Sequence, residues 1–76
     1  MKELLEFIAK SLVGYPDDVY VTEEESAGLT VLELHVNDQD MGKVIGKQGR
    51  IAKSIRALIK ASASRKNKKV IVEIVQ

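Results

Sequence analysis

The sequence predicts a two-layer α+β domain, in which three helices cover one face of a three-stranded sheet. Apolar residues recur with helical and strand periods in the order helix, strand, strand, helix, helix, strand. The chain has 76 residues, of which 45% are hydrophobic, enough for one small packed core. We therefore expect residues 1–76 to form a single domain.

The first half of the chain predicts one helix and one β-hairpin. Residues 2–13 carry apolar side chains at spacings of three and four, and Gly14 with Pro16 beyond it ends the helix. Residues 18–25 and 29–36 alternate apolar and polar side chains, as half-buried strands do. Because only a short turn separates them, the two strands should pair antiparallel. The side chains expected to share an apolar face within each strand are Val19 and Val21, and Leu32, Leu34 and Val36.

Two helices follow the hairpin. Asp38 or Asp40 is the expected capping residue of a very short helix over residues 40–45, which Gly46 interrupts. A longer helix then runs from near residue 50 to about residue 64, with an apolar side at a period of 3.6 and a cationic side opposite. The residues on the cationic side are Arg50, Lys53, Arg56 and Lys60.

The last strand is predicted over residues 70–75. It is apolar on nearly both faces, which is typical of a strand buried beneath helices.

Charge is divided unevenly between the two halves of the chain. Residues 1–40 hold 2 Lys/Arg and 10 Asp/Glu, a balance of −8, whereas residues 41–76 hold 10 and 1, a balance of +9. The two halves could neutralise each other across the fold. Surface ion pairs stabilise a fold only slightly, however, so a basic face for a polyanion is the better explanation.

Catalysis and cofactor binding have little support. The chain has no cysteine, which excludes disulfides, a thiolate nucleophile and a zinc–thiolate site. The one histidine, His35, shares a strand face with Glu33, where a solvated role is favoured over a general base or a metal ligand. We therefore expect no enzyme activity and no cofactor. Without a membrane-length apolar run or a signal-peptide pattern, the expected location is the cytoplasm.

Two glycines separated by two polar residues lie at the centre of residues 43–51. Such a turn at the start of a helix favours anions. The spacing fails the nucleotide-binding templates, because a P-loop needs four residues between its glycines and the dinucleotide pattern needs a third glycine after a strand. A small-molecule substrate is therefore not expected. Together with the adjoining cationic helix, the turn predicts contact with the phosphates of a polyanion.

Residues 44–50, V-I-G-K-Q-G-R, resemble the V-I-G-x-x-G signature of KH domains, which clamp about four single-stranded nucleotides. The helix and strand ahead of this core are similar to the type II KH topology, α-β-β-α-α-β, with three helices packed on one face of a three-stranded mixed sheet. The resemblance covers the whole chain and extends to the small bacterial KhpA family of RNA-binding proteins. One departure is Ala52, which stands where the KH pattern has isoleucine, and it bears only on local helix packing.

The resemblance implies a single-stranded RNA-binding protein that acts as an RNA chaperone or post-transcriptional regulator. Members of that family pair with KhpB (Jag/EloR), a larger KH-containing protein, and in some bacteria the pair is linked to cell elongation and cell-wall homeostasis. We accordingly expect a homodimer or a KhpB-like partner. The alternative is an assembly module that docks a second copy or KhpB and binds little RNA itself. Single-stranded DNA is a further ligand left open.

The same resemblance implies which residues contact RNA. The two glycines would admit the sugar-phosphate backbone, while Lys47 and Gln48 contact its oxygens. Ile45 would either floor a groove for bases, with aliphatic residues of the 29–36 strand, or pack in the core. All aromatic residues precede residue 21, which disfavours recognition by stacking. The expected RNA-binding residues are Lys43, Ile45, Gly46, Lys47, Gln48, Gly49, Arg50 and Lys53.

Overall fold

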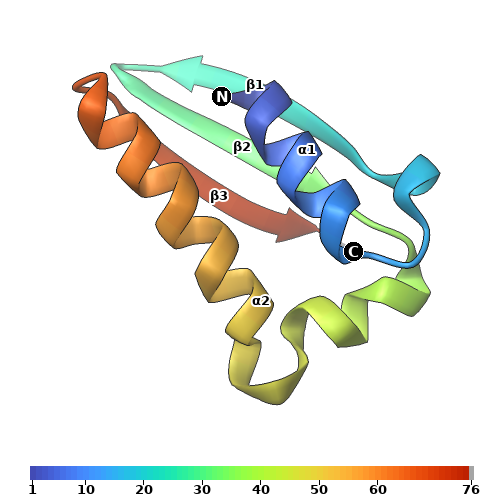
Figure 1. Cartoon of the computed structure of the whole chain (residues 1–76). Coiled ribbons are helices and arrows are strands. Elements are labelled where there is room, and N and C mark those ends of the chain that lie inside the picture. Colours follow the sequence, from blue (N-terminus) through green and yellow to red (C-terminus); the bar gives the residue numbers. More distant parts are fainter. Residues whose placement is uncertain (76) are drawn as a thin grey trace.

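A three-stranded mixed sheet forms one layer of the computed structural model, which describes residues 1–75 (Figure 1). The strands are β1 (Tyr20–Ser26), β2 (Leu29–His35) and β3 (Lys69–Val75), in the order β1-β2-β3. β1 pairs antiparallel with β2, and β2 pairs parallel with β3. The predicted hairpin and the mixed sheet are therefore confirmed.

Two α-helices form the second layer within the described residues, not the three that were predicted. They are α1 (Lys2–Leu12) and α2 (Asp38–Arg65), and a short 3₁₀ turn (Pro16–Asp18) precedes β1. The element order is therefore α1-β1-β2-α2-β3. The predicted second and third helices form one kinked element, because the break at residues 46–49 is a tight turn with no loop beyond it. Neither helix in the described part of the chain is long and apolar enough to cross a membrane.

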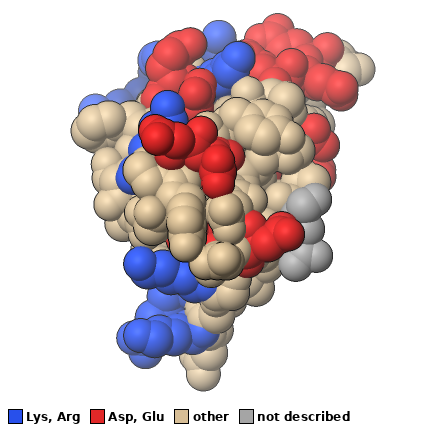
Figure 2. All heavy atoms as spheres, turned by 90° about the vertical axis from the view of Figure 1, so that its right-hand side faces the viewer, with Lys and Arg blue, Asp and Glu red and all other residues tan. Residues whose placement is uncertain are grey.

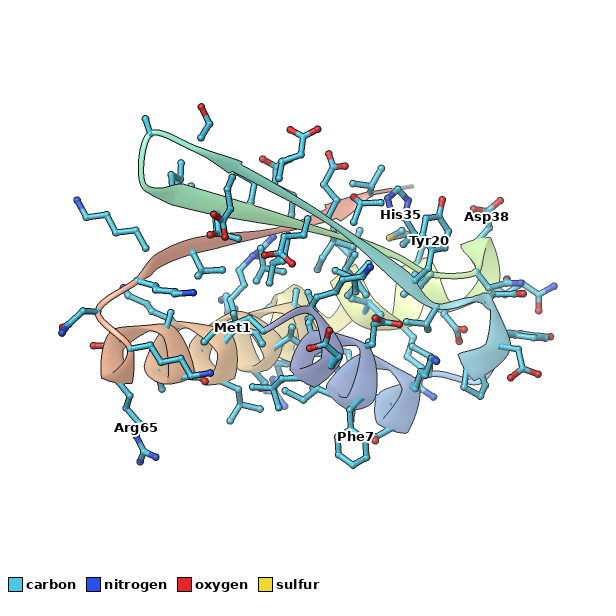
Figure 3. The ribbon with its side chains drawn as sticks, turned by 90° about the horizontal axis from the view of Figure 1, so that it is seen from above. Met1, Phe7, Tyr20, His35, Asp38 and Arg65 are labelled. Atoms are coloured by element: carbon cyan, nitrogen blue, oxygen red, sulfur yellow. The ribbon has the colours of Figure 1, made fainter. Side chains whose placement is uncertain are left out.

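Both helices pack against the same face of the sheet, and no described helix covers the other face (Figure 3). The hydrophobic core lies between the two layers and includes every side chain predicted for the apolar strand faces. Full burial of each large aliphatic side chain contributes roughly 1.5–3 kcal/mol. Ala52 is also buried, in the first turn of α2 after the break at residues 46–49. The largest fully buried side chains are Leu5, Leu32, Leu34, Val44, Ile55 and Ile59.

The last strand, which was predicted to be buried beneath helices, is covered by them on one face only. β3 lies at an edge of the sheet, and Ile71 and Glu73 on its outer face are exposed because the helices cover only the inner face. At this edge, the Arg56 Nε on α2 donates a hydrogen bond of 3.3 Å to the carbonyl of Val72. Arg56 therefore covers part of an edge that would otherwise be open to pairing with another strand.

The predicted caps of α2 are also corrected. The N-cap is Asn37, whose side-chain oxygen accepts a hydrogen bond of 2.7 Å from the N–H of Gln39. Asp38 and Asp40 instead lie in the first turn of the helix.

Asp40 makes a tertiary contact in place of a cap. It is only 4% exposed, and its two carboxylate oxygens accept hydrogen bonds from the N–H groups of Gly14 (2.9 Å) and Tyr15 (3.0 Å). These bonds tie the segment after α1 to the start of α2. They explain why an aspartate is buried here, since each oxygen meets a backbone donor.

Candidate functional site

The kink in α2 is a short stretch of left-handed backbone. Gly46 is extended (φ −66°, ψ 176°), and the next three residues all have positive φ: Lys47 at 52°, Gln48 at 62° and Gly49 at 70°. Glycine adopts this region readily, whereas for other residues it costs about 1–2 kcal/mol each. Two non-glycine residues held in this way mark the turn as a candidate functional site, because such strain gathers at binding and catalytic sites.

Two hollows flank the kink. The smaller has a volume of about 180 Å³ and lies between the arm of α2 before the kink and the arm after it. The larger, about 380 Å³, is shallow and is lined by Lys47, Gln48 and Arg50. Among the described residues, no acidic or aromatic side chain lines either hollow. The residues around the smaller hollow are Gly42, Lys43, Gly46, Lys47, Arg50 and Ile51.

The structure brings most of the predicted site residues together at these hollows. Five of the eight line one hollow or both, and Gly49 completes the turn. Lys53 lies one turn further along α2, is exposed and lines neither hollow. Ile45 is 49% exposed, so the alternative that it packs in the core is wrong.

The aliphatic side chains on the inner face of the 29–36 strand are not available to floor a base-binding groove. Leu32 and Leu34, on the inner face of β2, are 0% exposed, and β2 is the central strand. The strand beside α2 is β3, as the bond between Arg56 and Val72 shows. Any groove along α2 would therefore be bordered by β3.

Sequence reasoning missed Gly42 and Ile51 as residues that line the smaller hollow. Gly42 lies four residues before Gly46, and this spacing places two residues on the same face of a helix. This spacing was the signal in the sequence that could have identified Gly42 as a residue beside the turn. Ile51 is expected on the apolar side of the helix, and it is indeed partly buried against the core.

One group of cations lies at the end of the molecule that carries the kink. Figure 2 shows Lys and Arg side chains at the lower, narrow end, where Figure 1 places the kink, whereas the upper part of the same face carries most of its Asp and Glu side chains together with further Lys and Arg side chains. The exposed acidic run Glu23–Glu25 lies on β1, away from α2. The cations at the kink are therefore set apart from this acidic run.

The aromatic side chains lie elsewhere. Tyr20 stacks on His35 with ring centroids 4.2 Å apart, at the end of the sheet near Asp38 (Figure 3). Phe7 is 71% exposed on α1 and points away from the sheet. The Tyr15 hydroxyl donates a hydrogen bond of 2.8 Å to the side chain of Gln39. The described residues include no group of three or more His, Asp or Glu that could hold a metal ion.

Comparison with known proteins gives consistent matches over the whole chain. The family model described as "KhpA/KhpB, KH domain" matches residues 2–74. Among the similar curated proteins, RNA-binding protein KhpA of Clostridium perfringens is 61% identical over 75 residues, which cover 99% of this chain and 100% of that protein. RNA-binding protein KhpA of Caldanaerobacter subterraneus is 55% identical over the same shares of the two chains. RNA-binding protein KhpA of Listeria monocytogenes is 49% identical over the full length of both. No solved structure gives a significant match. The chain therefore belongs to the KhpA/KhpB family of KH domains.

Proposed function

We propose that this protein binds single-stranded RNA and clamps the RNA backbone at the kink of α2. The observation that carries the proposal is the left-handed turn at residues 46–49, which is flanked by cations and bordered by two hollows without acidic residues. The names of the related proteins agree with RNA as the ligand. KH domains hold about four nucleotides in this way.

The two glycines make room for the strand. Beyond its chain neighbours and the adjoining backbone of α2, a Cβ added at Gly46 would meet no described atom within 4 Å, so the space above this residue is open to a ligand. Gly49 has a different task, because its φ of 70° is a conformation that side chains disfavour. One glycine thus admits the backbone of RNA, and the other shapes the turn.

The side chains of the turn supply the charge and the donors. Lys47 and Arg50 line both hollows, and Gln48 lines the larger one. Lysine contributes a compact cation, while arginine offers a fork of donors that suits phosphate. Lys43 and Lys53 extend this cationic surface before and after the turn. Ile45, exposed beside it, offers an aliphatic surface to a base.

A single clamp of about four nucleotides binds weakly, so useful affinity requires a second binding unit. We propose that a second copy of this chain or a KhpB-type partner supplies it, and that the complex acts as an RNA chaperone or regulator. The resemblance would connect such a complex with cell elongation and the cell wall. The exposure of Leu4 and Phe7 on α1 and of Leu58 on α2 supports docking through the helices.

The test is the double variant Lys47→Asp with Gln48→Asp. RNA binding should be lost while the circular dichroism spectrum and unfolding temperature stay close to those of the wild type. The charge-matched control is Lys10→Asp with Ser11→Asp, two exposed positions on α1, which should leave binding nearly unchanged. For the wild type, the plot of log affinity against log salt should fall with a slope of roughly −0.7 per neutralised phosphate.

The same variant distinguishes RNA binding from the assembly alternative. If the folded double variant keeps the RNA affinity of the wild type, the clamp proposal is wrong. If it instead loses a second copy or a KhpB-type partner in co-purification, and nuclease treatment makes no difference, assembly is the main role of the turn. Competition between matched RNA and DNA oligonucleotides decides between the two nucleic acids.

A further inference from the structure

We propose that the RNA strand held at the kink continues along α2 to a second nucleotide subsite, at the opposite end of that helix where β3 begins. The inference rests on the proposed RNA-binding function, and it adds a site and a longer footprint to it. The observation behind it is a hollow of about 370 Å³ between the last turns of α2 and the first residues of β3.

This subsite has a cationic rim and an apolar floor. Lys60 on α2, Lys68 just before β3 and Lys69 at the start of β3 line the hollow, and among the described residues no acidic side chain does. Leu29 and Ile71 are the aliphatic lining residues on the outer face of the sheet, and Ile71 is 45% exposed. Three ammonium groups suit a phosphate, and the aliphatic floor suits the face of a base.

A simpler explanation accounts for only part of this arrangement. Lysines near the C-terminus of a helix are favoured by its negative end, which fits Arg65 in the last turn of α2. The effect falls off within that turn, and Lys60 lies five residues before the end. The negative end of the helix also gives no reason for the exposure of Ile71 beside these lysines. A nucleotide subsite accounts for both features.

A row of cations connects the kink with this hollow. Lys53, Arg56 and Lys60 recur at spacings of three and four along α2, and Arg56 is held at the edge of β3 by its bond to Val72. That bond uses one of the five donors of the guanidinium group.

The length of α2 sets the length of the footprint. From Arg50 to Ser64 the helix rises about 21 Å, at 1.5 Å per residue. Stacked nucleotides rise about 3.4 Å each, so roughly six of them span this distance. The predicted footprint is therefore longer than the four nucleotides of the clamp.

The experiment measures the affinity of single-stranded RNA oligonucleotides of four and ten nucleotides by titration of amide NMR shifts. A ten-nucleotide strand offers about seven registers to a four-nucleotide clamp, so length alone gives up to about sevenfold tighter binding. We expect a larger gain for the wild type, with shifts at residues 66–71 only for the longer strand. Lys68→Glu should weaken the longer strand by about three- to tenfold and leave the four-nucleotide strand unchanged.

Two further variants separate a local subsite from the general field of the lysines. Lys66→Glu makes the same change of charge at an exposed residue of the same connection that does not line the hollow, and it should alter either affinity by less than about twofold. Ile71→Ser removes the apolar floor without a change of charge, and it should weaken only the longer strand.

Three outcomes would overturn the subsite. The first is that Lys68→Glu and Lys66→Glu lose the same RNA affinity, and the second is that Lys68→Glu weakens both strand lengths equally. The third is that the wild type binds the ten-nucleotide strand no more than about sevenfold more tightly than the four-nucleotide strand. In each of them the clamp still stands if the wild type binds the four-nucleotide strand. If the wild type binds neither strand, the proposed RNA-binding function itself fails.

Discussion

Replacing Gly46 by alanine should leave the fold intact and weaken RNA binding. The backbone of Gly46, with φ −66° and ψ 176°, lies in a region open to every residue. Beyond its chain neighbours and the adjoining backbone of α2, a methyl group there would meet no described atom within 4 Å. The fold therefore gives no reason for glycine at this position, and the proposed clamp does, because the added methyl group would stand where the RNA backbone approaches.

The expected magnitudes follow from this geometry. Alanine restricts the unfolded chain and should stabilise the protein by about 0.4–1 kcal/mol. A chain of 76 residues unfolds with an entropy of about 160 cal/mol/K, so the unfolding temperature should rise by roughly 2–6 °C. If the methyl group displaces one hydrogen bond to a charged phosphate, the loss is about 1.5–3 kcal/mol, or roughly 10- to 150-fold in affinity.

Gly49→Ala is the matched comparison, since it makes the same chemical change three residues away. Its φ of 70° penalises alanine by about 1–2 kcal/mol, which should lower the unfolding temperature by roughly 6–12 °C. Thermal unfolding by circular dichroism and RNA titration at 25 °C measure both variants. An unchanged RNA affinity of Gly46→Ala would refute the close approach of RNA at this residue. A clear fall in its unfolding temperature would refute the extended, unobstructed backbone of Gly46 in the turn.

Three further predictions concern the support of the site. Asp40→Ala leaves the N–H groups of Gly14 and Tyr15 without their acceptors, so the free energy of unfolding from chemical denaturation should fall by about 2–4 kcal/mol. A fall of less than about 1 kcal/mol would contradict the stabilising role of these two hydrogen bonds between the segment after α1 and the start of α2. Asn37→Ala removes the cap of α2 and should lower the unfolding temperature by about 6 °C, with Asn37→Asp, which keeps an acceptor, as the milder control. Arg56→Met keeps the aliphatic stem but uncovers the edge of β3, so light scattering should detect association that grows with concentration; a strictly unchanged particle size would argue against edge protection.

The parts of the fold that depend on periodicity could be predicted from the sequence. The alternation in β1 and β2 identified their buried faces, because a strand with one covered face must place every second residue in the core. The two faces of β3 could not be told apart in this way, since both are apolar in sequence. Only the strand order, with β3 at the edge, leaves Ile71 exposed.

Asp40 illustrates a tertiary contact that local rules cannot find. An aspartate near the start of a helix is ordinarily explained as a cap, although Asn37 is the residue that caps α2. The partners of Asp40 are backbone N–H groups 25 and 26 residues earlier in the chain. Backbone donors have no residue-specific signature, so this contact appears only once α1 and α2 are placed together.

The location of the candidate site could be predicted from the sequence, whereas its backbone conformation could not. The two glycines and the neighbouring cations indicated where the site is. They did not indicate that Lys47 and Gln48 would also take positive φ, because neither residue type favours it. At about 1–2 kcal/mol each, this conformation consumes a sizeable share of the 5–15 kcal/mol by which domains are usually stable. Both side chains are exposed, so the core gains no packing from them in return. The turn instead directs both side chains to the hollow that they share with Arg50, and a role in binding accounts for a conformation that stability alone would disfavour.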